Sequence, residues 1–108
     1  MSASYLPLQV LSSSVCVGSE SDGWTLDREA SELDPERSFL FDVYFDSPFS
    51  VPPVVHLGMT GFDIDQCSSS RVNLSAVSVM ESGFQVRLTT WRSSRVYSVD
   101  FQWMAVGY

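Results

Sequence analysis

Short runs of alternating apolar and polar residues dominate this chain. The clearest is Phe39 to Phe45, where apolar side chains at every second position alternate with Asp42 and Tyr44. A period of two places successive side chains on opposite faces of a strand, so one face of this run is expected to be buried. Comparable runs predict strands over residues 8–17, 54–59, 72–79, 84–90 and 95–106. The pattern therefore predicts an all-β fold, a six-stranded antiparallel β-sandwich.

The segments between these runs predict turns and one local irregularity. Glu81-Ser82-Gly83 is typical of a hairpin turn, and residues 18–23 and 63–70 are polar and loop-like. Residues 25–36 have only a faint helical spacing, and Pro35 together with many acidic residues favours a loop. The apolar phase changes between Leu74 and Val77, which predicts a β-bulge near Ser75-Ala76.

The last two strands predict both core residues and an exposed aromatic side chain. Phe84, Val86 and Leu88 share one phase, whereas Trp91 shares the other with Gln85, Arg87 and Thr89. We therefore expect Trp91 to be partly exposed; the alternative is a tryptophan at the edge of the core. The core is expected to contain residues from three strands, namely Phe39, Phe41, Phe84, Phe101 and Trp103.

An exposed tryptophan next to arginines is the chemistry that a sugar site needs. The ring covers the apolar face of a pyranose, and guanidinium groups bind its hydroxyls. Trp91 and Tyr97 flank Arg92 and Arg95 in one short polar segment. Tyr97 has a competing interpretation, because it shares a phase with Val99 and its ring would then pack in the core.

Charge and length exclude several classes of function. The chain has 108 residues and a net charge of −7, and all six basic residues are arginines. This charge disfavours binding to nucleic acid or to anionic membranes. No apolar run is long enough to insert into a membrane, and Met1 to Leu6 does not resemble a signal peptide. We expect one domain over residues 1–108, with residues 1–6 flexible, and the cellular location stays open between cytosolic and secreted by another route.

No recognisable catalytic or metal-binding pattern is present in the sequence. His56 is the only histidine and is interpreted as a structural or surface residue. Asp63 and Asp65 lack the remaining ligands of a calcium loop, and acidic pairs such as Asp34 and Glu36 lie in a predicted loop. We expect no enzymatic activity, no cofactor and no metal. Cys16 and Cys67 have no metal-ligand spacing, and the sequence leaves open whether they pair.

An ordered set of short motifs resembles the H-type lectin domain. The resemblance extends from Phe39 to Val106 and is looser from Val10 to Trp24. Its motifs are Ser47-Pro48-Phe49, Pro52-Pro53-Val54-Val55, Phe62-Asp63-Ile64-Asp65, Arg71-Val72, Ser82-Gly83-Phe84, Thr90-Trp91, Val96-Tyr97-Ser98 and Gln102-Trp103-Met104-Ala105. The family's second bridging cysteine corresponds to Leu88, so the resemblance implies that the family disulfide is absent here.

The resemblance implies a galactose or N-acetylgalactosamine site at a subunit boundary of a trimer or hexamer. One chain would contribute Arg71, Trp91, Arg92 and Tyr97, and its neighbour would contribute Asp34, with Asp22 or Asp27 as alternatives. The family usually has histidine at the position of Arg92, which puts a strict preference for the N-acetyl sugar in doubt. The expected function is therefore a multivalent, non-catalytic agglutinin. A β-sandwich module that binds another protein, and a carbohydrate-active enzyme or its accessory module, are the alternatives.

Overall fold

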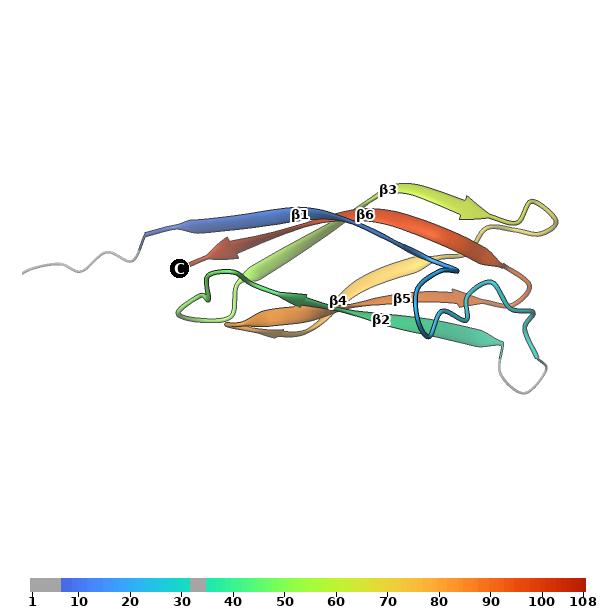
Figure 1. The fold of residues 1–108 in the computed structure, drawn as a ribbon, viewed down its shortest axis with the longest axis horizontal. Coiled ribbons are helices and arrows are strands. Elements are labelled where there is room, and N and C mark those ends of the chain that lie inside the picture. The colour runs from blue at the N-terminus through green and yellow to red at the C-terminus, as the bar shows by residue number, and fades with distance from the viewer. Residues whose placement is uncertain (1–6, 32–34) are drawn as a thin grey trace, which may run out of the picture.

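The computed structural model describes residues 7–31 and 35–108, and in this part of the chain six strands form two facing sheets (Figure 1). The expectations for residues 1–6 and for Asp34 lie outside the described residues. The strands are β1 (Gln9–Gly18), β2 (Glu36–Tyr44), β3 (Val54–Ile64), β4 (Asn73–Met80), β5 (Gly83–Trp91) and β6 (Val96–Gly107). The predicted six-stranded antiparallel β-sandwich is confirmed.

Each sheet has three strands, and the two central strands, β5 and β6, are the last two strands of the chain. One sheet has the order β1-β6-β3 and the other has the order β2-β5-β4. Residues 92–95 connect the two central strands β5 and β6, so the chain crosses between the sheets at this point (Figure 1). The turn at 92–95 therefore lies at one end of the sandwich, between the two sheets. We call it the β5–β6 turn.

The core lies between the sheets and follows the predicted phases closely. In β6, every second residue from Val99 to Ala105 is buried, and Phe101 is completely inaccessible. Phe84 and Trp103 are also buried, and their rings meet edge to face with centroids 5.5 Å apart. Phe39 and Phe41 are half-buried and pack against this core. The predicted core residues are therefore confirmed, with these two at its margin.

The predicted bulge exists, but its predicted position is wrong. Leu74 and Ala76 keep the same inward phase, and the register of β4 against β5 shifts only between Val77 and Met80. Ser78 has a φ of +53° in this segment, which lets Val79 return to the core. The sequence pattern does not identify Ala76 as a core residue, so it predicts the phase change too early in β4.

Strand β3 continues to Ile64, beyond its predicted end at Met59, because two bulges keep it paired with β6. At the second bulge, Asp63 pairs with Ser98 and Ile64 pairs with Val96. Tyr97 is therefore the extra residue on β6 and does not share the phase of Val99. The interpretation of its ring as a core residue is wrong for this reason, and Tyr97 is half-buried.

The irregular segment before β2 closes one end of the core. Trp24 and Leu26 are buried there, although the sequence pattern assigned neither to the core. The Trp24 indole Nε1 donates a hydrogen bond to the Val96 carbonyl oxygen at 2.9 Å, and the Val96 amide donates to the Leu26 carbonyl at 2.7 Å. These bonds attach the segment to the first residue of β6. No helix in the described ranges is long and apolar enough to cross a membrane.

Candidate functional site

The described candidate residues gather at the end of the sandwich where β5 ends and β6 begins. Trp91 is the last residue of β5, Arg92 opens the β5–β6 turn, and Tyr97 is the second residue of β6. Arg71 lies two residues before β4, whose first residue pairs with Thr89 near the end of β5. Strand order therefore brings together residues that are far apart in the sequence (Figure 1). Asp34 belongs to the undescribed residues 32–34.

Trp91 is displayed on the outer face of its sheet. Its side chain is 36% exposed, whereas Thr90 beside it is completely buried. Trp91 pairs with Glu36 at the start of β2, which places a carboxylate-bearing residue directly opposite the ring in the neighbouring strand. The predicted partial exposure of Trp91 is thus confirmed, and its phase within β5 is the cause.

Arg92 has a backbone conformation that is unusual for a residue with a side chain. Its φ is +56°, in the left-handed region, which costs a non-glycine residue roughly 1–2 kcal/mol. The Arg92 amide donates a hydrogen bond to the Pro35 carbonyl oxygen at 3.0 Å. Arg92 is exposed and follows Trp91 directly in the chain.

Arg71 is held at both of its ends by neighbours in β5 and the β5–β6 turn. The Thr90 hydroxyl donates to the Arg71 carbonyl oxygen at 2.5 Å, and Arg71 Nη1 donates to the Ser94 hydroxyl at 3.4 Å. Ser94 is completely buried, and its hydroxyl also donates to the Ser69 carbonyl. The Arg71 side chain is therefore half-buried and oriented, rather than a freely solvated charge at the end of a strand.

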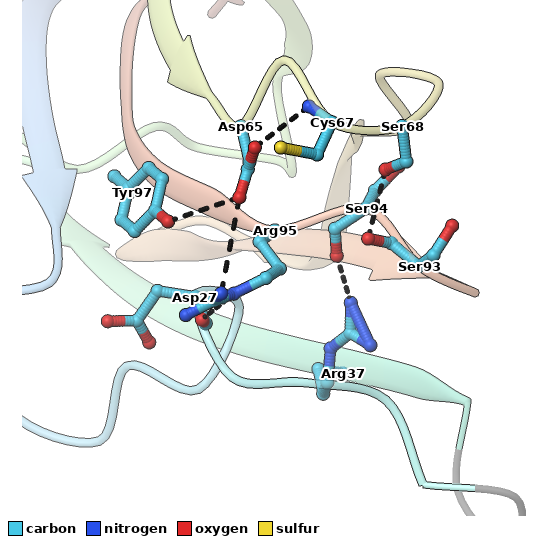
Figure 2. Close-up of polar contacts among 9 residues, drawn as sticks. All are labelled: Asp27, Arg37, Asp65, Cys67, Ser68, Ser93, Ser94, Arg95 and Tyr97. Atoms are coloured by element: carbon cyan, nitrogen blue, oxygen red, sulfur yellow. Dashed lines mark hydrogen bonds and ion pairs between the residues drawn. The ribbon is translucent and has the colours of Figure 1, made fainter.

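Tyr97 belongs to a second polar group at the same end, which Figure 2 shows. Its hydroxyl donates to Asp65 Oδ2 at 3.5 Å, and the Arg95 guanidinium lies 5.8 Å from the centre of its ring. Arg95 Nη1 is 4.0 Å from Asp65 Oδ2, and Arg95 Nε donates to the Asp27 carbonyl oxygen at 2.8 Å. An ion pair this exposed contributes little stability, about 0–1 kcal/mol. The role of this ion pair is to orient the Asp65 carboxylate, which accepts the hydrogen bond from the Tyr97 hydroxyl.

The neighbours of Asp65 lower the pKa of its carboxyl group. The hydrogen bond from the Cys67 backbone amide, 2.8 Å long, is the main cause that lowers the pKa of Asp65, and the cation of Arg95 and the Tyr97 hydroxyl act in the same direction. The same carboxylate raises the pKa of the Cys67 thiol. Asp65 is therefore a permanent anion at neutral pH.

Two buried residues that sequence reasoning missed hold the β5–β6 turn in place. Arg37 donates from Nη1 to the Arg92 carbonyl at 3.0 Å and from Nη2 to the Ser94 carbonyl. Ser94 in turn accepts a hydrogen bond from Arg71 through its hydroxyl. A signal for Arg37 was present, because it shares the apolar phase of Phe39 and Phe41, where a charged residue is unusual. No comparable signal distinguishes Ser94 from Ser93.

The remaining polar candidates lie elsewhere or make no site. His56 is exposed on the outer face of β3, which agrees with its interpretation as a surface residue. Cys16 and Cys67 are exposed free thiols. Within residues 7–31 and 35–108, no three His, Cys, Asp or Glu side chains are close enough together to hold a metal ion. The chemistry available at this end is therefore an exposed indole, oriented guanidinium groups, a phenol and a carboxylate. Such a set can stack on a sugar ring and bind its hydroxyls.

Comparison with known sequences gives a family for this arrangement. A sequence model of the H-type lectin domain matches residues 40–106, which include Arg71, Trp91, Arg92 and Tyr97. The chain is also 34% identical over 71 residues to a protein of Fuscovulum blasticum described as "ATP synthase subunits region ORF 7". That match covers 66% of this chain and 62% of the Fuscovulum protein.

Comparison with solved structures gives the same fold. The wild-type discoidin II of Dictyostelium discoideum superposes with a TM-score of 0.80 at 23% identity, over 100% of this chain and 40% of discoidin II. A second structure, of recombinant discoidin II, gives a TM-score of 0.78 over 98% of this chain and 39% of that one. The chain thus corresponds to about two fifths of discoidin II in length, and at this identity the likeness concerns the fold.

Proposed function

The chain belongs to the H-type lectin domain family, and on this premise we propose that it is a multivalent, non-catalytic lectin for terminal galactose or N-acetylgalactosamine. A carbohydrate-binding lectin fold follows from the family and from the discoidin neighbours. The sugar, the residues and the subunit arrangement are the proposed parts. In the proposed site, Trp91 stacks on the sugar and Arg71, Arg92 and Tyr97 bind its hydroxyls.

The observation that carries this proposal is the exposed Trp91 ring at the same end of the sandwich as Arg71, an arginine that is held by the fold. An indole on a protein surface loses apolar hydration when it covers the C–H face of a sugar. Galactose-type sugars have an axial 4-hydroxyl, and a guanidinium can bind two adjacent hydroxyls at once. Arg71 is fixed through Thr90 and Ser94, so little side-chain freedom is lost when it binds a hydroxyl.

We further propose that each site lies at a boundary between subunits of a homo-oligomer, a trimer or a hexamer. Asp34 of a neighbouring chain would then supply the carboxylate that accepts hydrogen bonds from the sugar. The support is the resemblance of Asp34 to a position of the family's site, together with the partial exposure of Trp91, which leaves its ring accessible to a neighbouring chain. Several weak sites on one rigid assembly gain avidity through effective concentration, and this would make the protein an agglutinin.

A glycan array combined with one substitution tests the proposal. Wild-type protein is expected to bind glycans with terminal galactose or N-acetylgalactosamine, and Trp91→Ala is expected to lose roughly 1–3 kcal/mol of binding free energy through the lost stacking. The fold should survive, because the Trp91 ring lies outside the core. Isothermal titration with a galactoside and a melting curve measure both effects.

Tyr44→Ala is the matched control. Tyr44 is an exposed aromatic side chain, 78% accessible, at the opposite end of the sandwich. Its loss should leave sugar affinity unchanged. If Trp91→Ala and Tyr44→Ala bind a galactoside equally well, the site is misplaced. If the wild-type protein binds no glycan on the array, the alternative of a protein-binding β-sandwich module is favoured.

A further inference from the structure

The β5–β6 turn contains Arg92, a proposed sugar ligand, together with Ser94 and Arg95, which contact the proposed ligands Arg71 and Tyr97. A buried arginine from β2 contacts this turn. Arg37 is the second residue of β2 and pairs with Thr90 of β5. The residue is only 8% exposed, and its guanidinium points toward Ser94 of the turn (Figure 2). A buried guanidinium is expected to have specific partners, because arginine is rarely buried unless it is paired.

The hydrogen bonds of Arg37 show what those partners are. Nη1 donates to the Arg92 carbonyl at 3.0 Å and to the Pro35 carbonyl at 3.3 Å, and Nη2 donates to the Ser94 carbonyl. One planar group therefore bonds to two carbonyls of the turn that are two residues apart. The guanidinium plane fixes the spacing between these donors, so it also fixes the spacing between the two carbonyls.

The two carbonyls belong to residues whose geometry decides how the proposed ligands are presented. Arg92 has a φ of +56°, and its amide is bonded to the Pro35 carbonyl, which also accepts from Arg37. Ser94 holds the Arg71 guanidinium through its hydroxyl. A shift of the turn would therefore reorient Arg92 directly and release Arg71 indirectly.

We propose that Arg37 is a positioning residue for ligand binding, which holds the β5–β6 turn so that Trp91, Arg92 and Arg71 face the ligand together. The inference rests on the proposed function, because these three residues are the proposed sugar ligands. Arg37 itself does not touch the sugar. It acts through the backbone of the turn, and no other described side chain bonds to both the Arg92 and the Ser94 carbonyls.

Arg37→Lys is the variant that separates charge from geometry. Lysine keeps the positive charge but has one donor nitrogen, which cannot reproduce the two-carbonyl spacing. We expect galactoside affinity to fall at least tenfold in Arg37→Lys. Hydrogen exchange of the Arg92 amide should accelerate at least tenfold, whereas the amides of Val86 and Phe101 in the strand centres should keep their protection. Arg87→Lys, the same change at an exposed position of β5, is the control and should alter neither quantity.

The two measurements distinguish failure of this inference from failure of the proposed function. A folded Arg37→Lys protein with wild-type affinity and wild-type Arg92 exchange overturns the inference. Weaker binding together with a uniform loss of protection also overturns it, because Arg37 then acts only on global stability. A wild-type protein that binds no galactoside overturns the proposed function. Exchange alone then decides whether Arg37 holds the turn: selective acceleration at Arg92 supports it, and uniform acceleration does not.

The wild-type protein provides a second measurement if Arg37→Lys does not fold. The guanidinium protons of Arg37 should give slowly exchanging NMR signals, in contrast to those of exposed Arg87. Saturating galactose should slow the exchange of the Arg37 protons further, since a bound ligand restricts the turn. Arg37 protons that exchange as fast as those of Arg87, or that do not respond to the sugar, would overturn the inference.

Discussion

At the scale of single residues, Arg92 combines a strained backbone with an exposed position in the proposed site. Its left-handed conformation is supported through the backbone, because its amide donates to the Pro35 carbonyl and its carbonyl accepts from Arg37. A different side chain at this position would therefore meet the same backbone support. This separation makes Arg92 suited to change the sugar preference while the fold stays the same.

Arg92→His is expected to shift preference towards N-acetylgalactosamine over galactose. The family resemblance implies histidine at this position, and an imidazole is smaller than a guanidinium. Histidine tolerates a positive φ better than most residues, so the melting temperature should change little. Competitive titration with both sugars gives the affinity ratio. Identical ratios in the two proteins would mean that Arg92 faces solvent and has no part in recognition.

The pKa of each cysteine thiol depends on a neighbouring carboxylate. A hydrogen bond to Asp100 raises the pKa of Cys16, and a hydrogen bond to Asp65 raises the pKa of Cys67. A raised thiol pKa means less thiolate, so both thiols should react slowly with iodoacetamide near pH 8. Asp65→Asn removes the charge beside Cys67, so the pKa of Cys67 should fall and its alkylation should become faster.

Asp100→Asn is the reciprocal control for this thiol prediction. It should accelerate alkylation of Cys16 and leave Cys67 unchanged. The rate at each cysteine can be followed by peptide mass spectrometry from pH 7 to pH 10. Equal acceleration of both thiols in either variant would point to a global opening of the fold instead of a local charge effect.

At the scale of elements, β6 contributes buried residues to the core and, near its first residue, Tyr97 to the proposed site. Phe101 is completely buried, and its ring meets that of Phe41 at 6.1 Å in an edge-to-face contact with the opposite sheet. Phe101→Ala should lower the free energy of unfolding by roughly 3–5 kcal/mol through lost burial and the cavity left behind. Chemical denaturation measures this loss.

Gln102→Ala is the matched control for Phe101→Ala on the same strand. Gln102 is exposed, and its amide donates only a long, 3.4 Å hydrogen bond to the Ser14 hydroxyl. Its replacement should change stability by less than about 0.5 kcal/mol. A smaller effect for Phe101→Ala than for Gln102→Ala would contradict the phase of β6.

The alternation of apolar and polar residues was sufficient to predict the six strands and most of the core, because each strand buries only one face. It failed where the backbone adds an extra residue. The bulge at Tyr97 changes the side to which the ring points, and nothing in the local pattern marks it. The bulge in β4 was detected through a phase change but misplaced, since Ala76 is small enough to be missed as a core residue.

The candidate site was only partly predictable for a related reason. The phase of β5 predicts the display of Trp91, which the structure confirms. The supports of the site come from contacts across the sandwich that no local pattern encodes. Arg37 reaches the turn from a strand 55 residues earlier, and Ser94 meets residues of a loop 25 residues earlier. Such contacts depend on strand order, which alternation does not define.

At the scale of the whole molecule, the proposed shared site predicts that binding requires the oligomer. If Asp34 of one chain completes the site of its neighbour, a lone subunit lacks an acceptor for the sugar hydroxyls. Each lost charged hydrogen bond is worth roughly 1.5–3 kcal/mol. Millimolar binding of a monosaccharide amounts to only about 4 kcal/mol, so the affinity of a monomer should fall below detection.

An interface variant that yields folded monomers tests this prediction. Light scattering establishes the size, and titration with galactose measures binding at the same concentration. Asp34→Asn in the intact oligomer is the companion variant and should weaken binding without changing the size. Monomers that bind as tightly as the wild-type protein would remove both the shared site and the role of Asp34.

The pairing of β1 with β6 determines at which end this domain can be joined to another protein or to a surface. Gln9 at the start of β1 lies opposite Gly107 at the end of β6, and both are at the far end of the sandwich from Trp91 (Figure 1). A tag, a fused protein or a sensor surface joined through either strand end would therefore hold the domain by its base. The Trp91 end would project away from the support, where the proposed sugar site would be accessible to a ligand in solution.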